Sequence, residues 1–397
     1  MPLPNVNVSV IGGGLGQVEP NQDGVAWLIV GGVSTPSWNE NKINLITSLQ
    51  EAEDVLGITK TNNPLAFAHI YDFYTLAGSG AKLYLTLLPD GWASNYTDVG
   101  NTLNLLKNQV PESVRLIGIS PADGQNTFTQ GIRQSVIGFI ATANIFASER
   151  CAQYKPTSVI LDGFSIDMSE SNYRNLKGAS EMKYVSVVLS HTPSLIDNNV
   201  EHGHDLNACV GLVLGRLAKI PVQRNLGRVK DGDLLQTNAY LNTDLIETVP
   251  DSKLQELHEK GYIFMRKHVG LPGYYFNDDT TCTPATSDFN SIARVRVIEK
   301  ARRIVRSTLL PYLLDEVEID PETGRLSASF VKEMQAVVEN ALDLQMTTNN
   351  EIISNRCVID PKQNVLATNK IDVVVKIIPF GYAKQIEVTV SFENPAS

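Results

Sequence analysis

The sequence predicts an α/β body with a largely parallel sheet, followed by an α+β C-terminal domain, with an extended β-strand arm at each terminus. Three observations lead to this fold class. Short apolar runs alternate with helical stretches from residue 25 to about residue 250, which is typical of strands covered on both faces. Helices and strands are segregated after residue 250, and both ends of the chain alternate apolar with polar side chains.

Length and composition agree with a globular protein of more than one domain. The chain of 397 residues corresponds to about two to three domains, and 43% hydrophobic with 19% charged residues allows a large core. We expect an N-terminal arm over residues 1–22, an α/β domain over 23–250, an α+β domain over 251–380 and a C-terminal strand arm over 381–397.

The first elements of the α/β domain have clear start and stop signals. Residues 25–32 (VAWLIVGG) predict a buried strand, and a shorter strand follows at 43–47. The next helix has Ser48 as its N-cap, Glu51 to close a capping box and Gly57 as its stop.

The remaining elements follow in the same way. A helix begins at Asn63-Pro64 and ends at Gly78. Further buried strands are expected at 81–89, 113–120, 157–163 and 183–190. After residue 250 we expect helices at 251–261, about 287–314 and 327–346, then strands near 351–359, 371–378 and 384–393.

Charge, cysteine content and hydropathy exclude several classes of protein. A formal charge of −10 and a pI of about 5.2 argue against nucleic acid as the main partner. The longest apolar stretch, residues 136–147, is too short to span a bilayer, and residues 1–4 do not resemble the start of a signal peptide. The four cysteines have no CxxC spacing, which predicts reduced core residues of a cytoplasmic protein: Cys151, Cys209, Cys282 and Cys357.

The glycine tract GGGLG at residues 12–16 is the first candidate for chemistry. It resembles a phosphate-binding turn, but Gln17 stands where the third glycine of GxGxxG belongs, and no Walker pattern occurs. A flexible hinge at Gly12, Gly13 and Gly14 is the favoured interpretation.

Two further motifs carry groups that could bind a metal or act in catalysis. In EHGHD, His202 and His204 could ligate a divalent metal together with His191, although an exposed loop before a helix is favoured. In LDGFSID, Asp162 and Asp167 flank a strand end, where capping or turn roles are favoured over catalysis. Because no GxSxG, HExxH or Cys/His constellation occurs, we expect no enzyme activity and no cofactor.

A basic helix is the strongest charge feature of the sequence. Residues 292–307 carry six basic side chains, of which Arg296, Lys300 and Arg303 share one helical face. Such a run is often only a solvated face. In an acidic protein it also predicts docking, either to acidic residues 315–322 of another copy or to a different protein.

The two chain ends are the most informative feature. Apolar residues alternate with polar ones at both: Val6, Val8 and Val10 at the start, and Ile386, Val388, Val390 and Phe392 at the end. A well-patterned strand at a terminus needs a partner, and an open sheet edge on another chain supplies one. One such arm is weak, but two arms per copy that reach different neighbours bind multivalently. The pattern therefore predicts a polymer of identical chains.

The order of elements resembles that of contractile tail sheath proteins of bacteriophages and related contractile injection systems. Residues 43–91 (INLITSLQEAEDVLG to AKLYLTLLPDG) resemble the sheath segment with a strand, two helices and another strand. Residues 207–229 resemble its small-residue helix, residues 277–313 (with TTCTPATSDF) its C-terminal long helix, and residues 371–395 its closing hairpin and final exchanged strand. The chain departs from the family at Asn277-Asp278, where many sheaths have an arginine, and the aromatic-rich strand between the last two helices is missing.

The resemblance implies a structural subunit that stacks in rings around an inner tail tube and contracts to drive it through a cell envelope. The implied partners are other copies of the chain, the tube, baseplate and tail terminator proteins, in a virion tail or contractile particle assembled in the bacterial cytoplasm. Gly12, Gly13, Gly14 and Gly381 would act as hinges during contraction. The alternatives are another tail structural protein, such as a tube or baseplate component, and an α/β enzyme acting on a sugar or nucleotide.

Overall fold

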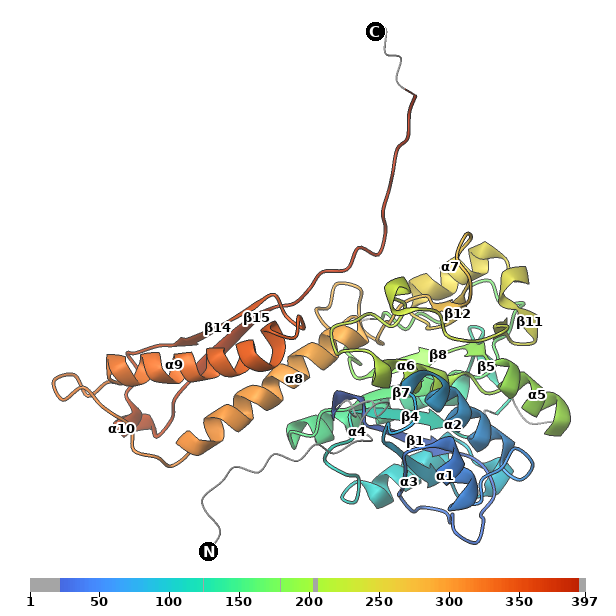
Figure 1. The fold of residues 1–397 in the computed structure, drawn as a ribbon, viewed down its shortest axis with the longest axis horizontal. Coiled ribbons are helices and arrows are strands. Elements are labelled where there is room, and N and C mark those ends of the chain that lie inside the picture. The colour runs from blue at the N-terminus through green and yellow to red at the C-terminus, as the bar shows by residue number, and fades with distance from the viewer. Residues whose placement is uncertain (1–21, 124, 179, 203–205, 393–397) are drawn as a thin grey trace, which may run out of the picture. The chain divides into compact units, whose positions relative to one another are not determined.

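The computed structural model describes residues 22–392, apart from residues 124, 179 and 203–205. The chain divides into two compact units, unit 1 over Met1–Glu299 and unit 2 over Lys300–Ser397 (Figure 1). The division falls inside helix α8 (Ile292–Leu309), so this helix contributes its first turns to unit 1 and the rest to unit 2.

A six-stranded sheet forms the centre of unit 1, in the order β2-β3-β1-β4-β7-β8. Neighbouring strands are parallel except for β2, which runs antiparallel to β3. The strands are β1 (Ala26–Val30), β2 (Asn44–Ile46), β3 (Leu83–Leu87), β4 (Leu116–Ser120), β7 (Ser158–Asp162) and β8 (Val185–Val188). The predicted largely parallel sheet is confirmed.

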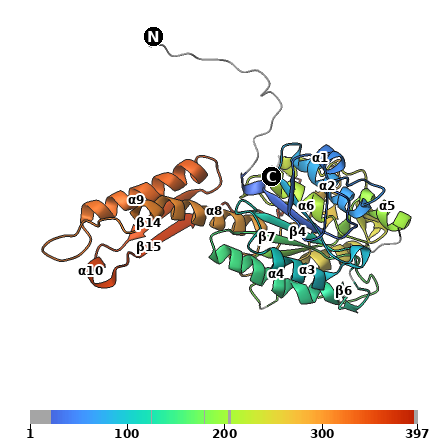
Figure 2. The ribbon, with the colours of Figure 1, turned by 90° about the horizontal axis from the view of Figure 1, so that it is seen from below.

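Helices cover both faces of this sheet (Figure 2). On one face lie α1 (Leu49–Asp54), α2 (Pro64–Ala77) and α6 (Val210–Lys219), and on the other α3 (Tyr96–Leu106) and α4 (Gln134–Ala152). Every side chain of β1 is buried as a result, which explains its near-continuous apolar sequence.

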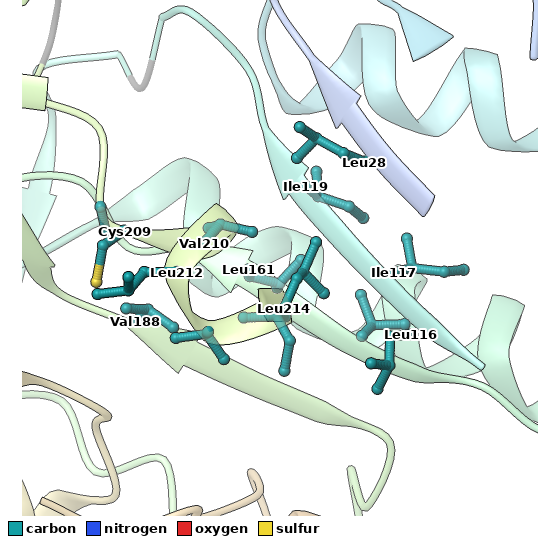
Figure 3. Close-up of a cluster of buried hydrophobic side chains, with 14 of the residues drawn as sticks. Leu28, Leu116, Ile117, Ile119, Leu161, Val188, Cys209, Val210, Leu212 and Leu214 are labelled. Carbon is teal, nitrogen blue, oxygen red and sulfur yellow. The ribbon is translucent and has the colours of Figure 1, made fainter. Parts of the chain in front are cut away.

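Glycines, which have no side chain, allow α6 to pack closely against the sheet and against α2. Val210 and Leu214 of α6 lie against the sheet (Figure 3), and a Cβ at Gly118 of β4 would lie within 2.6 Å of both. On the side of α6 that faces α2, a Cβ at Gly211 would lie 2.2 Å from the carbonyl oxygen of His69. A larger residue at either glycine would push these layers apart.

The predicted helix signals in this region are largely present. The Ser48 hydroxyl accepts a hydrogen bond from the Glu51 amide, but the Glu51 carboxylate accepts from Thr47, one residue before the predicted partner. Gly57 and Gly78 follow the first two helices with positive φ angles of 66° and 79°, which glycine adopts without strain.

The remaining elements of unit 1 are short. The strands are β5 (Phe128–Thr129), β6 (Ile132–Arg133), β9 (Ser190–His191), β10 (Tyr240–Leu241), β11 (Asp244–Leu245), β12 (Met265–Arg266) and β13 (Tyr275–Phe276). The helices are α5 (Pro193–His202) and α7 (Asp251–Lys260), with single 3₁₀ turns at Gln22–Gly24, Gly91–Ala93, Val229–Asp231 and Ile246–Thr248.

Residues 251–299 belong to unit 1, so the compact units divide later than the predicted boundary near residue 250. The Ile263 amide donates to the Val187 carbonyl at 3.0 Å, and the Cys282 amide donates to the Val185 carbonyl at 2.8 Å. These bonds attach the segment to β8, the last strand of the sheet. The pattern of strands alternating with helices ends near residue 250, but the residues that follow still belong to unit 1.

Unit 2 contains two helices and a two-stranded sheet. After the end of α8 come a 3₁₀ turn (Leu310–Tyr312), α9 (Ala328–Leu342), a π-helical turn (Asp343–Thr347), β14 (Ser354–Ile359), α10 (Val365–Thr368) and β15 (Val373–Ile378). α9 buries a stripe at helical spacing against the sheet, made of Val331, Met334, Val338 and Leu342. The predicted α+β C-terminal region is confirmed.

The sequence predicts a strand at each end of the chain. The expected N-terminal strand with Val6, Val8 and Val10, and the hinge at Gly12, Gly13 and Gly14, lie outside the described residues. Residues 381–392 follow β15 without regular secondary structure (the red segment after β15 in Figure 1). Within the described part of the chain, no helix has the length and apolarity needed to cross a membrane.

Candidate functional site

The hairpin of β14 and β15 is the first part of the candidate site. Its strands are antiparallel, with Ser354 opposite Ile378 at one end and Ile359 opposite Val373 at the other. One face, with Cys357 and Ile359, is buried beneath α9. The other face has no covering layer among the described residues. Its apolar side chains are exposed: Val358, Val374 and Ile378.

The two free edges of this hairpin differ. The Cys357 amide of β14 donates to the Glu339 side chain of α9 at 2.7 Å, so this edge is partly occupied. Backbone groups of an antiparallel pair point alternately toward and away from the partner strand. By this alternation, Val373, Val375 and Ile377 point their backbone groups to the free edge of β15. Among the described residues no hydrogen bond occupies those groups. The β15 edge can therefore accept another strand.

The segment after β15 is the second part. Ile386, Val388, Val390 and Phe392 are exposed to 78%, 76%, 88% and 107%. The Gln385 amide group donates to the Glu387 carboxylate at 2.8 Å, which places these two polar side chains on the same side of an extended chain. In the described part of the chain, this segment pairs with no strand. The segment keeps the predicted alternation of side chains, and its apolar side chains are exposed to water.

Helix α8 carries the predicted basic side chains with different degrees of exposure. Arg296 is buried, and its guanidinium donates to the Asp23 carbonyl at 3.2 Å. Lys300 forms an ion pair with Glu351 at 2.8 Å, with the two side chains only 17% and 8% exposed. Arg303 is half-buried. Long basic side chains can bury their aliphatic stems while their charged ends bind nearby oxygen atoms, as Arg296 does. Docking through Lys300 and Arg303 stays a prediction.

A buried polar network surrounds Asp162, one of the two predicted carboxylates. Its Oδ2 accepts from the Ser120 hydroxyl at 2.6 Å and from the Asn207 side chain at 2.7 Å. Its Oδ1 accepts from the Ala208 and Phe164 amides, both at 2.8 Å. Burial raises the pKa of Asp162 to about 6, although these four donors favour the charged form. The network joins the carboxyl ends of β4 and β7 to the segment before α6.

This network lacks the arrangement of a catalytic triad. His69 Nε2 lies 2.8 Å from the Ser120 hydroxyl, and Ser120 in turn contacts Asp162, so the serine stands between the other two. In a nucleophilic triad the histidine stands between serine and carboxylate. All three side chains are fully buried, and burial lowers the pKa of His69 to about 3. A structural role for the network follows from this geometry.

The other predicted chemical groups have local roles. Asp167 accepts from the Ser169 amide at 2.9 Å and the Ser169 hydroxyl at 2.7 Å, as a turn residue does. His191 is buried, with Nδ1 2.8 Å from the Asn207 carbonyl, and burial lowers its pKa to about 4. The side chains of His202 and His204 lie outside the described residues. No group of three His, Cys, Asp or Glu residues suited to a metal occurs in the part of the chain that the structure describes.

A shallow groove of about 380 Å³ lies between α3 and α4. Amide and hydroxyl side chains line most of it: Asn95, Thr97, Asn101, Asn104, Gln125, Ser135 and Thr142. It contains no histidine, carboxylate or cysteine, so it offers no group for acid–base or nucleophilic catalysis near neutral pH. Neither Asp162, Asp167 nor His191 lines this groove.

Two family models together match most of the chain. The model of the DUF2586 N-terminal domain matches residues 3–280, and the model of the DUF2586 C-terminal domain matches residues 288–397. The chain belongs to the DUF2586 family. The second match begins just before α8, and the hairpin with its following segment lies wholly within it. A search of curated proteins gives no match for this DUF2586 protein.

Solved structures similar to this DUF2586 protein include sheath proteins and a chain of a prophage baseplate. The helical sheath of the anti-feeding prophage in its contracted state matches with a TM-score of 0.63 and 14% identity, covering 99% of this chain and 100% of that one. A chain in the six-fold symmetrised baseplate of the same prophage matches with a TM-score of 0.62 and 15% identity, covering 99% of both chains. A sheath tail protein of Desulfitobacterium hafniense matches with a TM-score of 0.51 and 10% identity, covering 95% and 100%.

These likenesses establish the fold of the DUF2586 chain. Identities of 10–15% over nearly whole chains mean that the architecture is shared although most side chains differ. The resemblance to contractile tail sheath proteins noted from the sequence is therefore confirmed at the level of the fold. Sequence patterns identified the C-terminal strand and Asp162, but no local signal marked Ser120, His69 or Asn207 as partners of Asp162.

Proposed function

We propose that this DUF2586 protein is the structural subunit of a contractile tail sheath. In this role it polymerises as a helical tube around an inner tail tube, and it contracts to drive that tube through a cell envelope. The observation that carries the proposal is a segment of alternating, exposed apolar side chains that follows a hairpin with an open edge, within the fold of sheath proteins. Each copy has both halves of a contact that a second copy completes.

Strand exchange links the copies in this proposal. The C-terminal strand with Ile386, Val388, Val390 and Phe392 adds to a neighbour's hairpin and buries its apolar face. One donated strand makes about four or five ladder hydrogen bonds, each contributing about 1 kcal/mol net. Val6, Val8 and Val10 serve a second neighbour in the same way. Since association of a single arm costs entropy, two arms to different neighbours are what stabilise a lattice.

Contraction requires that the links persist while the bodies move. Gly381 joins β15 to the strand, it is exposed, and a Cβ there would meet no atom within 4 Å. Gly12, Gly13 and Gly14 are the corresponding joint at the other end of the chain. Glycine absorbs large changes in φ and ψ at low cost, so these joints serve as hinges.

The proposal names structural partners and no substrate. They are other copies of the chain, an inner tube protein, and baseplate and tail terminator proteins, with no nucleic acid and no membrane insertion. The particle is a virion tail or a contractile injection system, assembled in the bacterial cytoplasm. Of the candidate residues for docking to the tube or to a neighbouring copy, Lys300 and Arg303 remain, whereas Arg296 is buried.

Two other functions remain as alternatives. A baseplate component is favoured by the likeness to a chain in the prophage baseplate, whereas a tube protein fits poorly with a large α/β unit. An α/β enzyme acting on a sugar or nucleotide would need its site near Asp162, but the described groups there are buried and engaged with one another.

Negative-stain electron microscopy of the purified full chain tests the proposal. A sheath subunit forms hollow, transversely striated cylinders at high protein concentration or on co-expression with its tube. A baseplate component forms discrete rings or plates of limited size. Particles that remain monomeric under both conditions would overturn the proposal, and a chain that forms only short plates would favour the baseplate alternative.

A further inference from the structure

Two basic side chains lie directly opposite each other on the uncovered face of the hairpin. Arg356 of β14 pairs in register with Lys376 of β15, between the exposed Val358–Val374 pair and the Ser354–Ile378 pair. Like charges at directly opposite positions destabilise a sheet. Among the described residues neither side chain forms a hydrogen bond or an ion pair. An acidic side chain placed beside these two positive charges would therefore stabilise the hairpin.

The edge beside Lys376 is the open one. Glu339 of α9 occupies the Cys357 amide on the β14 edge, whereas the β15 edge has no such contact in the described chain. A strand added to β15 lies about 5 Å from it, which is within reach of directly opposite side chains. An acidic residue on that strand would contact Lys376, with Arg356 on the far side of it.

The C-terminal strand offers one acidic side chain in its described part. Its polar side chains are Gln385, Glu387, Thr389 and Ser391, so Glu387 is the only carboxylate among them. When the apolar side of this strand continues the α9-facing layer of Val373, Val375 and Ile377, its polar side continues the face that carries Lys376. Both faces of the added strand then match the sheet.

Alternation alone leaves the register of this strand undecided. A slip of one residue turns the apolar side chains to the wrong face and is excluded by burial. A slip of two residues keeps every side chain on its proper face, so apolar burial changes little. It would, however, move Glu387 from Lys376 to Val374 or Ile378 and leave the positive pair without a counter-charge. A charge is therefore the feature that can distinguish these registers.

We propose that Glu387 fixes the register of the exchanged C-terminal strand by pairing with Lys376 and Arg356 at the free β15 edge of the acceptor copy. This inference rests on the strand exchange of the proposed function and names its acceptor edge and its register. Lys376 and Arg356 of each copy thus receive Glu387 from one neighbour. The pairing also offsets the repulsion within the hairpin, so the acceptor sheet is more stable with the strand than without it.

A charge swap in the full chain tests this pairing. Glu387→Lys should raise the critical concentration for assembly about tenfold, because each link then places a third positive charge beside the pair. Lys376→Glu should also weaken assembly, since Glu387 then faces a carboxylate. The double variant Glu387→Lys/Lys376→Glu should restore assembly to within about threefold of the wild type. Critical concentration is measured by sedimentation, with circular dichroism to verify that each variant folds.

The matched control is Thr389→Lys, which adds the same charge on the same face two residues away. It should weaken assembly less than Glu387→Lys does. Lys376→Glu should restore assembly of the Glu387→Lys variant more fully than that of the Thr389→Lys variant. Equal effects of the two lysine variants, or no restoration in the double variant, would overturn the pairing while leaving the sheath proposal intact. A wild-type chain that never assembles would overturn both.

Zero-length cross-linking gives a direct readout. Carbodiimide joins a lysine amine to a carboxylate in contact, so assembled wild-type protein should yield a Lys376–Glu387 link. Assembly from a mixture of ¹⁵N-labelled and unlabelled copies shows whether the link joins different chains. Links only from Lys376 to other carboxylates, or only within one copy, would contradict the proposal.

Discussion

The two units of this chain differ in how far a single copy completes them. In unit 1 the central strand β1 has neighbours on both edges and helices over both faces, and all its side chains are buried. In unit 2 the sheet has two strands and one covering helix, and the side chains of β15 alternate between half-buried and exposed. A two-stranded sheet is at best marginally stable alone. The contrast is what the proposed strand exchange predicts, because a strand from another copy would extend the sheet of unit 2.

The strand after β15 makes this difference concrete. Its four apolar side chains are exposed, whereas apolar side chains of the strands in unit 1 are mostly buried. Exposed apolar surface is unfavourable in water, so burial of these side chains against another copy would stabilise the proposed assembly. If the C-terminal segment serves assembly, changes in it should weaken assembly while unit 1 keeps its free energy of unfolding.

Removal of residues 383–397 should have the largest effect, which is loss of all cylinder formation. The deletion takes away the donated strand and leaves every acceptor edge empty. Unit 1 should keep its stability, because its core contains no residue of the deleted segment. All three tryptophans belong to unit 1, so urea unfolding followed by tryptophan fluorescence reports on that unit: Trp27, Trp38 and Trp92. Long cylinders formed by the truncated chain would show that the strand is not the link.

A pair of single substitutions should have the next largest effect. Val388→Asp places a charge on the apolar face of the donated strand and should raise the critical concentration at least a hundredfold, since a buried unpaired charge costs about 3–5 kcal/mol. Thr389→Asp, on the opposite face, should change it only a few-fold. Sedimentation of both variants measures this difference. Equal losses would mean that the faces of the strand are assigned wrongly.

The sequence predicted the parts of this molecule whose signals are local. Continuous apolar runs revealed the buried strands of unit 1, because burial on two faces leaves a direct trace in the sequence. The network around Asp162 could not be predicted in this way. His69, Ser120 and Asn207 come from separate elements, and only the fold brings them to Asp162.

The basic helix shows a second limit of sequence reasoning. Helical spacing placed Arg296, Lys300 and Arg303 on one face correctly, but spacing does not say whether that face is in water. Arg296 is buried because a backbone carbonyl, that of Asp23, lies within reach of its guanidinium. Likewise, alternation in the C-terminal strand fixes its faces but cannot fix its register.

Alanine substitutions at two glycines of unit 1 should change its stability in opposite directions, because one glycine is tightly packed and the other is exposed. Gly211→Ala places a Cβ 2.2 Å from the His69 carbonyl oxygen and should lower the free energy of unfolding by about 2–3 kcal/mol. Gly138→Ala, on exposed α4 surface with no atom within 4 Å of its Cβ, should raise it by about 0.5–1 kcal/mol. Urea unfolding by tryptophan fluorescence measures both. A neutral Gly211→Ala variant would contradict the close contact of α2 with α6.

A pair of acidic residues extends the comparison of the units to pH. Asp72 of α2 is fully buried in unit 1, accepts from the Thr192 hydroxyl at 2.8 Å, and has its pKa raised to about 7 by burial. Asp320 in unit 2 is exposed to solvent on its side chain, and the Thr323 and Glu322 amides that donate to it lower its pKa. The two shifts have opposite signs, so they make opposite contributions to stability as the pH rises.

Substitution of each residue by asparagine should expose these opposite signs. The contribution of Asp72 is present below its unfolded pKa near 3.8 and is lost as the pH rises through about 7. Asp72→Asn cannot ionise and keeps an oxygen for Thr192, so between pH 4 and pH 8 it should gain about 2–4 kcal/mol of unfolding free energy relative to the wild type. Comparison with the wild type at each pH cancels the contributions of His69 and His191, whose pKa values are lowered. The contribution of Asp320 is present above its unfolded pKa, so Asp320→Asn should lose protection at pH 8 and not at pH 3, and only slightly, because solvent screens an exposed group. Tryptophan fluorescence in urea measures the first variant, and amide hydrogen exchange at residues 320–327 measures the second. A pH-independent difference between Asp72→Asn and the wild type would show that the pKa of Asp72 in the folded state is not raised above its unfolded value.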